Sequence, residues 1–390
     1  MATEQVGTSK SIVAHDIDQL SHKVELHLSL HTSISTSSCE HEYLTEIGSN
    51  EVGEKISIFQ QDKIADVNLR TASDSVVLDN TLKSNLATQP TPLEFPANVK
   101  IGIPLLTKTE IKENLDHFEK LKSRSEGLTA QKKTLENKPC FNDTLPLHED
   151  NAVELKGEKG LVHANVIKVQ YENIEPNSNC CPIAIASAYP SPSVKGIQNF
   201  WQMALEQDTK LIIDFTELNG RFVREEHWYY PTEVGDTKHY QDVEVKLDRS
   251  VDYHDKKASL SVYQVTDKQT GVSKEVKRYH ETEWQEMKGL NPSAFIDLVE
   301  STANDKPNSL IVHCRAGLGR TMTFYAGLEL YHMVKLSKVD RTAMQNTIDE
   351  VVMSMRHQRS ESAVSRSKQR ETLLIATKYW LAVHNAKAQL

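Results

Sequence analysis

Residues 308–323 read Asn-Ser-Leu-Ile-Val-His-Cys-Arg-Ala-Gly-Leu-Gly-Arg-Thr-Met-Thr, the most informative segment of the chain. Its first part holds the continuous apolar run 310–312, which is the pattern of a strand buried on both faces. From Thr321 onward the apolar residues recur at helical spacing, at positions 324, 328 and 331. The sequence therefore predicts a central strand, a tight loop over residues 314–320, and a helix that begins where the loop ends.

The composition of residues 314–320, which we call the signature loop, predicts a phosphate-binding cup. Gly317 and Gly319 lack side chains where the backbone must curl inward. Successive N–H groups and the positive end of the following helix can then point at one anion. Arg320 adds a planar guanidinium that can hold two phosphate oxygens at once. The other predicted substrate-binding members of this loop are Arg315, Ala316 and Leu318.

Cys314 lies at the base of this predicted cup. A free thiol titrates near ~8.5, but a helix N-terminus and nearby cations bring reactive thiols to roughly 3.5–7.5. We therefore expect Cys314 to be a thiolate nucleophile, with the Thr321 hydroxyl donating a hydrogen bond to the sulfur. A lone cysteine is more often a small buried apolar residue. The adjacent strand, glycines and helix start favour the nucleophile.

Residues 313–321 resemble the signature of the cysteine-dependent protein tyrosine phosphatases, and Arg315 with Ala316 is most similar to the versions that bacterial pathogens inject into host cells. The resemblance implies an α/β fold over residues 98–390, with a twisted mixed β-sheet flanked by helices. It also implies hydrolysis of phosphotyrosine in proteins through a cysteinyl-phosphate intermediate, without cofactor or metal. The expected location is the host cytoplasm after secretion, or otherwise the cytoplasm of the cell that makes the protein.

A second stretch, Phe141-Asn-Asp143-Thr-Leu145-Pro146, resembles the loop that binds phosphotyrosine in this family. The resemblance assigns Phe141 to flank the phenyl ring of the substrate and Asp143 to hold its peptide backbone. An aromatic wall makes the pocket too deep for phosphoserine. Pro139 and Cys140 replace the Asn and Arg that precede this loop in the family, and ordinary packing is the alternative role for Phe141.

The family carries Trp-Pro-Asp about thirty residues before the cysteine, where this chain has Trp284-Gln285-Glu286. The resemblance implies that Glu286 is the general acid that protonates the leaving phenolate, a transfer that typically contributes 10²–10⁴-fold. Trp284 would anchor the loop. Loss of the proline frees the backbone at Gln285, and Glu281 and Glu283 are alternative acids.

Residues 355–369 resemble the family's closing loop, in which two glutamines surround the attacking water. Ser365 replaces the first of these glutamines and Gln369 retains the second. We therefore expect Gln369 to position water, or Ser365 to do so through an additional water molecule. Glu233 is a candidate for orienting Arg320, because a guanidinium needs a carboxylate partner to stay aimed. The alternative for Glu233 is a solvated acidic loop.

Composition sets the remaining limits. The 390 residues carry a net charge of -9, which argues against nucleic acid as the main partner. No apolar stretch approaches the ~20 residues of a membrane span or forms a signal-peptide core. Five cysteines without a C-x-x-C pair favour neither a disulfide framework nor a zinc site. The mean hydropathy of -0.50 is that of a soluble protein.

Residues 1–95 differ from the rest, with fourteen acidic against six basic residues and many Ser and Thr. They are predicted to be a targeting or chaperone-binding module with one strand at 24–30, or alternatively a disordered acidic tail. Residues 89–96 read as a linker. The domain that follows opens with a capping box at Thr107 and a helix with an apolar stripe at 111, 115, 118 and 121. Further strands are expected at 211–215, 243–247 and 259–265, and a final helix at 370–381.

Three functions remain open at this level. The first is an active phosphatase acting on phosphotyrosine proteins. The second is a phosphotyrosine-binding protein without turnover, because Glu286 and Ser365 both depart from the family pattern. The third is a phosphoinositide phosphatase, although such sites usually add lysines to the signature loop and this loop adds only Arg315.

Overall fold

The computed structural model describes residues 101–134, 145–156, 160–168, 183–217, 223–253, 257–305 and 307–388. These residues belong to one compact unit, Pro92–Leu390. Phe141, Asp143 and all of residues 1–95 lie outside the described residues, as does the strand expected at 24–30. The roles and the domain boundary predicted there stay predictions.

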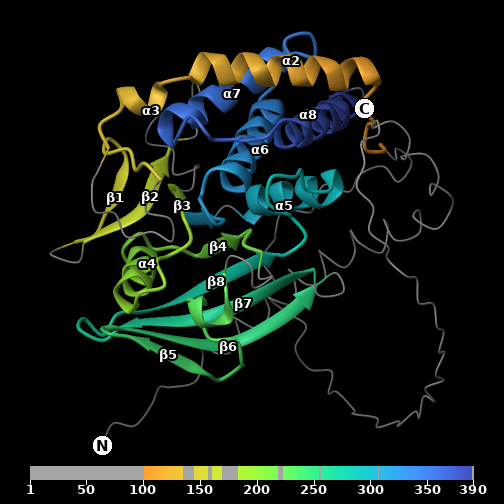
Figure 1. Cartoon of the computed structure of the whole chain (residues 1–390). Helices are drawn as coiled ribbons and strands as arrows, with labels where there is room; N and C mark the ends of the chain where they lie inside the picture. The colour runs from red at the N-terminus through yellow and green to blue at the C-terminus, as the bar shows by residue number, and fades with distance from the viewer. Residues whose placement is uncertain are drawn as a thin grey trace, which may run out of the picture. The chain divides into compact units, whose positions relative to one another are not determined.

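A mixed β-sheet of nine strands, in the order β1-β2-β3-β9-β4-β8-β7-β6-β5, forms the centre of the described part of the chain. The inner pairs β3·β9, β9·β4 and β4·β8 are parallel, and the outer pairs are antiparallel. Figure 1 shows the twist between its two ends. The strands are β1 Ala152–Glu154, β2 Leu161–Ile167, β3 Ile183–Ser187, β4 Leu211–Asp214, β5 Thr237–Tyr240, β6 Val243–Tyr253, β7 Ala258–Asp267, β8 Ser273–Glu281 and β9 Ser309–His313.

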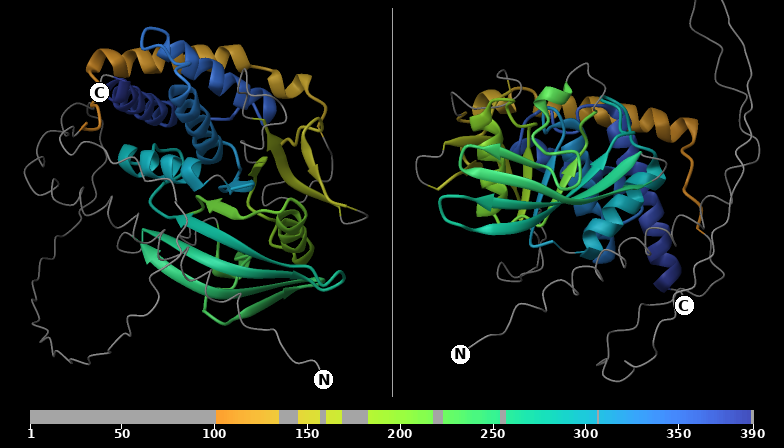
Figure 2. Two further views of the ribbon diagram at one scale, coloured as in Figure 1. Left: turned by 180° about the vertical axis from the view of Figure 1, so that it is seen from behind. Right: turned by 90° about the horizontal axis from the view of Figure 1, so that it is seen from below.

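Helices pack against both faces of this sheet. The views in Figures 1 and 2 agree that α2, α5, α6, α7 and α8 gather on one side of it. Helix α4 packs with the opposite face in a second apolar cluster. The helices are α2 Lys108–Ser125, α3 Leu128–Gln131, α4 Val194–Glu206, α5 Pro292–Asp305, α6 Gly319–Lys335, α7 Met344–Gln358 and α8 Ser367–Ala388, with a short 3-10 turn at Glu225–His227. The predicted α/β fold is confirmed.

Strand β9 explains why the sequence around it is apolar without alternation. Leu310 and Val312 face the cluster formed with α5 to α8, whereas Ile311 faces the cluster formed with α4. All three side chains are fully buried. Because successive strand side chains point to opposite faces, a strand covered on both sides needs an apolar residue at every position. The strand ends at His313 and delivers Cys314 to the carboxyl edge of the parallel strands.

The first helix confirms one prediction and corrects another. Thr107 caps α2 with the predicted capping box, and Gly127 follows the helix in a left-handed conformation. Phe118 and Leu121 are buried as expected, but Leu115 is 47 % exposed. Asn114 takes the buried position instead and binds the backbone of Ser367, so a polar contact replaces one member of the predicted apolar stripe.

Candidate active site

The signature loop closes tightly because two glycines meet other parts of the protein. Gly317 has φ +68°, and a Cβ there would overlap the carbonyl oxygen of Ser187 at the end of β3. A Cβ on Gly319 would lie 2.8 Å from Nε2 of Gln369. Glycine is required at Gly317 for its conformation and at both positions for space. The loop therefore curls between the sheet edge and the start of α8.

The electrostatic surroundings of Cys314 favour its ionised form. The side chain is buried, and burial alone would raise the pKa of the thiol. The positive charge of Arg320, together with hydrogen bonds from Thr321 and the backbone of Gly317, outweighs this and lowers the pKa of Cys314 below its ordinary value. Thr321 is itself buried, and its hydroxyl has no nitrogen or oxygen partner within the described residues. The Thr321 hydroxyl donates its hydrogen bond to the Cys314 sulfur.

Arg320 links the signature loop to the loop that carries the predicted acid. Its Nη1 donates to the carbonyl oxygen of Trp284 at 2.9 Å and lies 3.7 Å from Oε1 of Glu217. Glu233, the carboxylate expected to orient Arg320, is exposed, and the carboxylate that the described residues place beside Arg320 is that of Glu217. The expectation for Glu233 is wrong because Glu217, which follows β4 by three residues, already occupies that position.

We call residues 284–289 the acid loop. Trp284 anchors it as predicted: the ring is fully buried, packs edge-on against Phe215 at 4.8 Å, and donates from Nε1 to the carbonyl oxygen of Lys288 at 2.9 Å. The backbone N–H of Glu286 donates to Oε1 of Glu217. One carboxylate therefore contacts both the guanidinium of the signature loop and the backbone of the predicted acid.

Glu286 lies at the signature loop, and the alternative acids do not. Oε2 of Glu286 is 3.9 Å from Nη1 of Arg315, and both side chains are about 30 % exposed. Glu283 faces Lys257 at 3.6 Å. Glu281 is buried at the end of β8, where it accepts from the backbone of Glu283, and burial raises its pKa. Arg315 thus lies beside the predicted acid, and its contact with substrate stays a prediction.

Gln369 and Ser365 are both brought to the signature loop. Gln369 is buried in the first turn of α8, and a Cβ on Gly319 would touch its amide and the Ser365 hydroxyl, the latter at 2.9 Å. Oε1 of Gln369 accepts from the Ser365 hydroxyl at 3.3 Å and from the backbone of Arg366 at 3.2 Å. With its oxygen occupied, the amide nitrogen of Gln369 is the group nearest the loop.

A buried arginine from the segment 355–369 contacts the backbone of the signature loop, and the sequence did not predict this role. Arg359 is fully buried and donates from Nε to the carbonyl oxygen of Gly317 at 3.3 Å. It also donates to Nδ1 of His163 at 2.9 Å and to the side chain of Asn165. Because a guanidinium only donates, Nδ1 of His163 accepts and its Nε2–H donates to the carbonyl oxygen of Leu145, at 3.2 Å.

A second buried network lies beside His313, the residue before the nucleophile. Arg278 on β8 donates to Asp214 on β4 at 2.6 Å, and Asp214 is 3.6 Å from Nδ1 of His313. Burial alone would raise the pKa of Asp214, but the neighbouring His313 and Arg278 bring it well below its usual value. Burial lowers the pKa of His313. Nε2 of His313 shares a 2.7 Å hydrogen bond with the Tyr229 hydroxyl.

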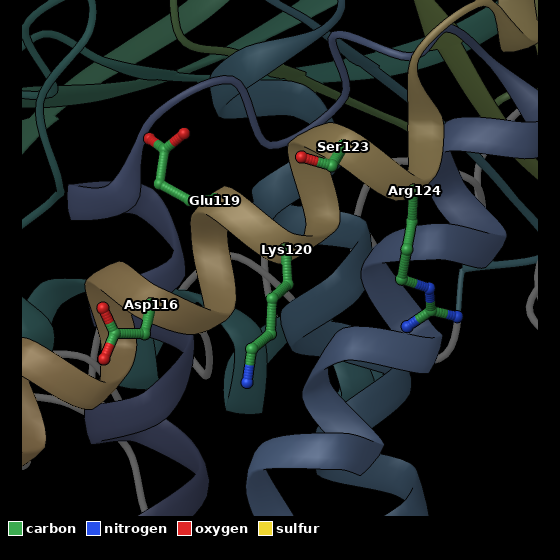
Figure 3. Close-up of a pocket in the computed structure, with 5 residues that line it drawn as sticks. All are labelled: Asp116, Glu119, Lys120, Ser123 and Arg124. Carbon is green, nitrogen blue, oxygen red and sulfur yellow. The ribbon is translucent and has the colours of Figure 1, made fainter.

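A surface hollow elsewhere on the described chain lacks the features of a site. It measures about 630 Å³ and is lined only by residues of α2, namely Asp116, Glu119, Lys120, Ser123 and Arg124. Figure 3 shows Glu119 pointing to one side of the helix and Lys120 and Arg124 to the other, without a common focus. Arg124 pairs instead with Glu350 of α7 at 3.0 Å. The convergent polar groups are those around Cys314.

The described residues contain neither a metal-binding cluster nor a membrane-spanning helix. No group of three or more His, Cys, Asp or Glu side chains in the described ranges could hold a metal ion. None of the helices described here is long and apolar enough to span a membrane.

Known proteins share both the sequence pattern and the fold. Receptor-type tyrosine-protein phosphatase S of Gallus gallus is 30% identical over 184 residues, which cover 42% of this chain and 12% of the relative. Tyrosine-protein phosphatase 69D of Drosophila melanogaster is 26% identical over 260 residues, which cover 63% of this chain and 17% of the relative. Human tyrosine-protein phosphatase non-receptor type 20 is 28% identical over 227 residues, covering 56% and 49%. The matches thus span at most about half the length of these three relatives.

Solved structures agree on the fold. The catalytic domain of human protein tyrosine phosphatase non-receptor type 18 superposes with a TM-score of 0.57 at 19% identity, covering 71% of this chain and 98% of that domain. A structure of PTPN18 in complex with HER2 phosphopeptides gives 0.56 at 19% identity, covering 68% and 99%. The family model described as protein-tyrosine phosphatase matches residues 137–374, which include every described residue of the site. The chain belongs to the protein-tyrosine phosphatase family.

Proposed function

We propose that this chain hydrolyses phosphotyrosine in proteins through a cysteinyl-phosphate intermediate. The observation that carries the proposal is the Cys314 thiol, whose pKa is lowered by Arg320 and Thr321 at the base of a loop that only glycine can close. A buried thiolate beneath converging N–H groups is an unfavourable arrangement unless it meets an electrophile whose negative charge those groups stabilise. A phosphate monoester fits that description.

In the first step the Cys314 sulfur attacks phosphorus, and the bond from phosphorus to the tyrosyl oxygen breaks. The loop amides and Arg320 hold the phosphoryl oxygens, whose charge is stabilised in the transition state. Glu286 donates its proton to the leaving tyrosyl oxygen. The products of this step are tyrosine, a carboxylate at Glu286 and phosphate bound to Cys314.

In the second step water attacks the phosphorus of the cysteinyl-phosphate. Glu286, now ionised, takes a proton from this water, and the sulfur leaves as a thiolate while phosphate is released. The Nε2 amide of Gln369 lies against the signature loop and is suited to orient the water, because its Oε1 is already bound to Ser365 and Arg366. The enzyme returns to its starting state without a metal in either step.

The substrate class rests on two residues outside the described ranges. Phe141 would form an aromatic wall and Asp143 would bind the peptide backbone, as their resemblance to the family's phosphotyrosine loop suggests. The complex of PTPN18 with HER2 phosphopeptides is a property of that protein and supports the same substrate class here. Phosphotyrosine-containing proteins are the partners that we propose.

A second candidate function is phosphotyrosine binding without turnover. The observations in its favour are Ser365 in place of the first glutamine and a predicted acid that contacts Arg315 at 3.9 Å. Steady-state kinetics on matched phosphotyrosine and phosphoserine peptides decide between the two. A phosphatase turns over the phosphotyrosine peptide far faster than the phosphoserine peptide and far faster than its Cys314→Ser variant. Tight binding with turnover no faster than Cys314→Ser contradicts the proposal.

The same kinetics with an inositol lipid as an additional substrate test whether the chain is a phosphoinositide phosphatase. Arg315 is the one extra cation of the signature loop, and its guanidinium faces Glu286. An inositol lipid has several phosphates that need further cations. Faster hydrolysis of the lipid than of the phosphotyrosine peptide would replace the substrate class proposed here.

We also propose that the protein acts in a host cell after secretion by a bacterium, with residues 1–95 binding a secretion chaperone. The supporting observation is the resemblance of Arg315 and Ala316 to the injected phosphatases. The relatives named above come from animals. Fusion of residues 1–95 to a reporter enzyme, with a fusion of residues 98–390 as control, tests export: signal from the first fusion alone is expected. If neither fusion is exported, the proposed secretion is contradicted.

A further inference from the structure

The acid loop lies directly on the beginning of α8. A Cβ on Gly289 would lie 2.6 Å from Oγ1 of Thr372 and 2.8 Å from the carbonyl oxygen of Lys368. Both contacts belong to the first turns of α8. The backbone of the acid loop therefore approaches this helix as closely as a glycine permits, and the two segments are neighbours although about eighty residues separate them in sequence.

A single side chain spans these segments at the edge nearest the predicted acid. Arg366 immediately precedes α8 and is exposed, and its Nη2 donates to Sδ of Met287 at 3.1 Å. Within the described ranges this is the one hydrogen bond of the guanidinium. Met287 follows Glu286 directly, has φ +67° and is 55 % exposed. A methionine in the left-handed region is strained.

The backbone of Arg366 contacts Gln369, the residue predicted to position water. Its N–H donates to Oε1 of Gln369 at 3.2 Å, and the neighbouring Ser365 hydroxyl donates to the same oxygen at 3.3 Å. Arg366 thus binds the residue after the predicted acid with its side chain and the predicted water-positioning amide with its backbone.

We propose that Arg366 is a positioning residue that holds Glu286 and Gln369 in register for the second step, an inference that rests on the proposed function. In that step Glu286 must accept a proton from the water that Gln369 orients, so a fixed separation matters most there. Glutamate has one more rotatable bond than aspartate, and the loop has glutamine where proline would restrict its backbone. The Arg366 to Met287 contact supplies the restraint that the loop's own sequence lacks.

Amide hydrogen exchange of residues 284–289 tests the restraint without any need for turnover. Removing one hydrogen bond of this kind typically changes an opening equilibrium about fivefold. Arg366→Ala and Met287→Ala are each expected to speed exchange by about that factor, and the double variant by no more than either. Lys368→Ala is the matched control, because Lys368 is exposed and its ammonium binds Glu371 at 3.0 Å. Equal exchange in Arg366→Ala and Lys368→Ala overturns the proposal.

Transient kinetics on a phosphotyrosine peptide test the catalytic consequence. Arg366→Ala is expected to lower kcat about fivefold with little change in KM, and to raise the burst of tyrosine product, because hydrolysis of the cysteinyl-phosphate slows. In a Glu286→Gln background the same change is expected to have no further effect on kcat. An undiminished fivefold effect in that background overturns the proposal. Wild-type turnover equal to that of Cys314→Ser overturns the proposed function instead, and the exchange measurement still judges the restraint.

Discussion

Nη1 of Arg320 donates a hydrogen bond of 2.9 Å to the carbonyl oxygen of Trp284. This contact joins the phosphate cup to the acid loop, since Trp284 begins that loop and Arg320 ends the cup. Glu217 reinforces the junction by lying 3.7 Å from Arg320 and accepting from the backbone N–H of Glu286. The guanidinium of Arg320 and the carboxylate of Glu217 therefore connect the acid loop to the cup.

The role of Glu286 predicts a change in leaving-group dependence. Glu286→Gln cannot protonate the leaving oxygen, so turnover of phosphotyrosine peptide should fall 10²–10⁴-fold, whereas esters of acidic phenols should lose much less. Rates measured over a series of aryl phosphates check this. Glu283→Gln is the control, because Glu283 is exposed beside Lys257. Unchanged turnover of the peptide in Glu286→Gln would falsify the assignment of the acid.

The junction predicts that two glutamates behave differently. Glu217→Gln removes the charge beside the buried Arg320 and is expected to lower kcat/KM about tenfold or more, since a hydrogen bond to a charged group contributes about 1.5–3 kcal/mol. Glu233→Gln changes an exposed side chain and should have no effect. Kinetics of both variants on one peptide provide the comparison. Equal losses in the two would mean that Glu217 does not orient Arg320.

The sequence alone predicted the strand, the loop and the helix around Cys314, because both-face burial, two glycines and helical spacing leave few alternatives. It also predicted that Glu286, Gln369 and Ser365 would lie near the loop, by resemblance, and the structure brings all three there. The helix begins at Gly319, two residues earlier than expected. That difference falls within the usual uncertainty of helix ends.

The partner of Arg320 could not be chosen from the sequence. Glu217 and Glu233 both lie between β4 and β5 in the sequence, and nothing in their local pattern says which side chain turns toward the cup. The missed signal was position: Glu217 lies three residues past the end of a buried parallel strand, at the carboxyl edge where sites in α/β sheets gather. The predicted burial of Leu115 was wrong for a similar reason, since helical spacing cannot reveal that Asn114 hydrogen-bonds to the backbone of Ser367.

The shape of the signature loop predicts that alanine is not tolerated at Gly317. Gly317→Ala adds both left-handed strain, about 1–3 kcal/mol, and overlap with the carbonyl oxygen of Ser187. Gly271→Ala is a matched control, because Gly271 has a similar φ of +71° with open space around it. Thermal unfolding and vanadate binding are the measurements. Both variants should lose stability, but only Gly317→Ala should lose vanadate; binding retained in Gly317→Ala would contradict the loop geometry.

Glu300 on α5 predicts a pH dependence of stability. Burial, and secondarily the charge of Asp297, raises the pKa of Glu300 to about 7 from an ordinary 4.5. The folded state then binds a proton that the unfolded state has lost, so stability falls as pH rises from about 4.5 to about 7, by about 3 kcal/mol at most. Glu300→Gln should flatten this slope in urea unfolding at several pH values. A slope equal to that of wild type would contradict the raised pKa.

We expect the Cys314 sulfur to be ionised at neutral pH under the cup, and the pH dependence of its alkylation measures this ionisation. Cys314 is buried, with its pKa lowered by Arg320 and Thr321. Alkylation by iodoacetate at this residue, followed by mass spectrometry, should titrate below the ordinary thiol value of ~8.5 and be blocked by vanadate. Arg320→Ala should move the titration upward. A wild-type titration near ~8.5, without protection by vanadate, would contradict the account.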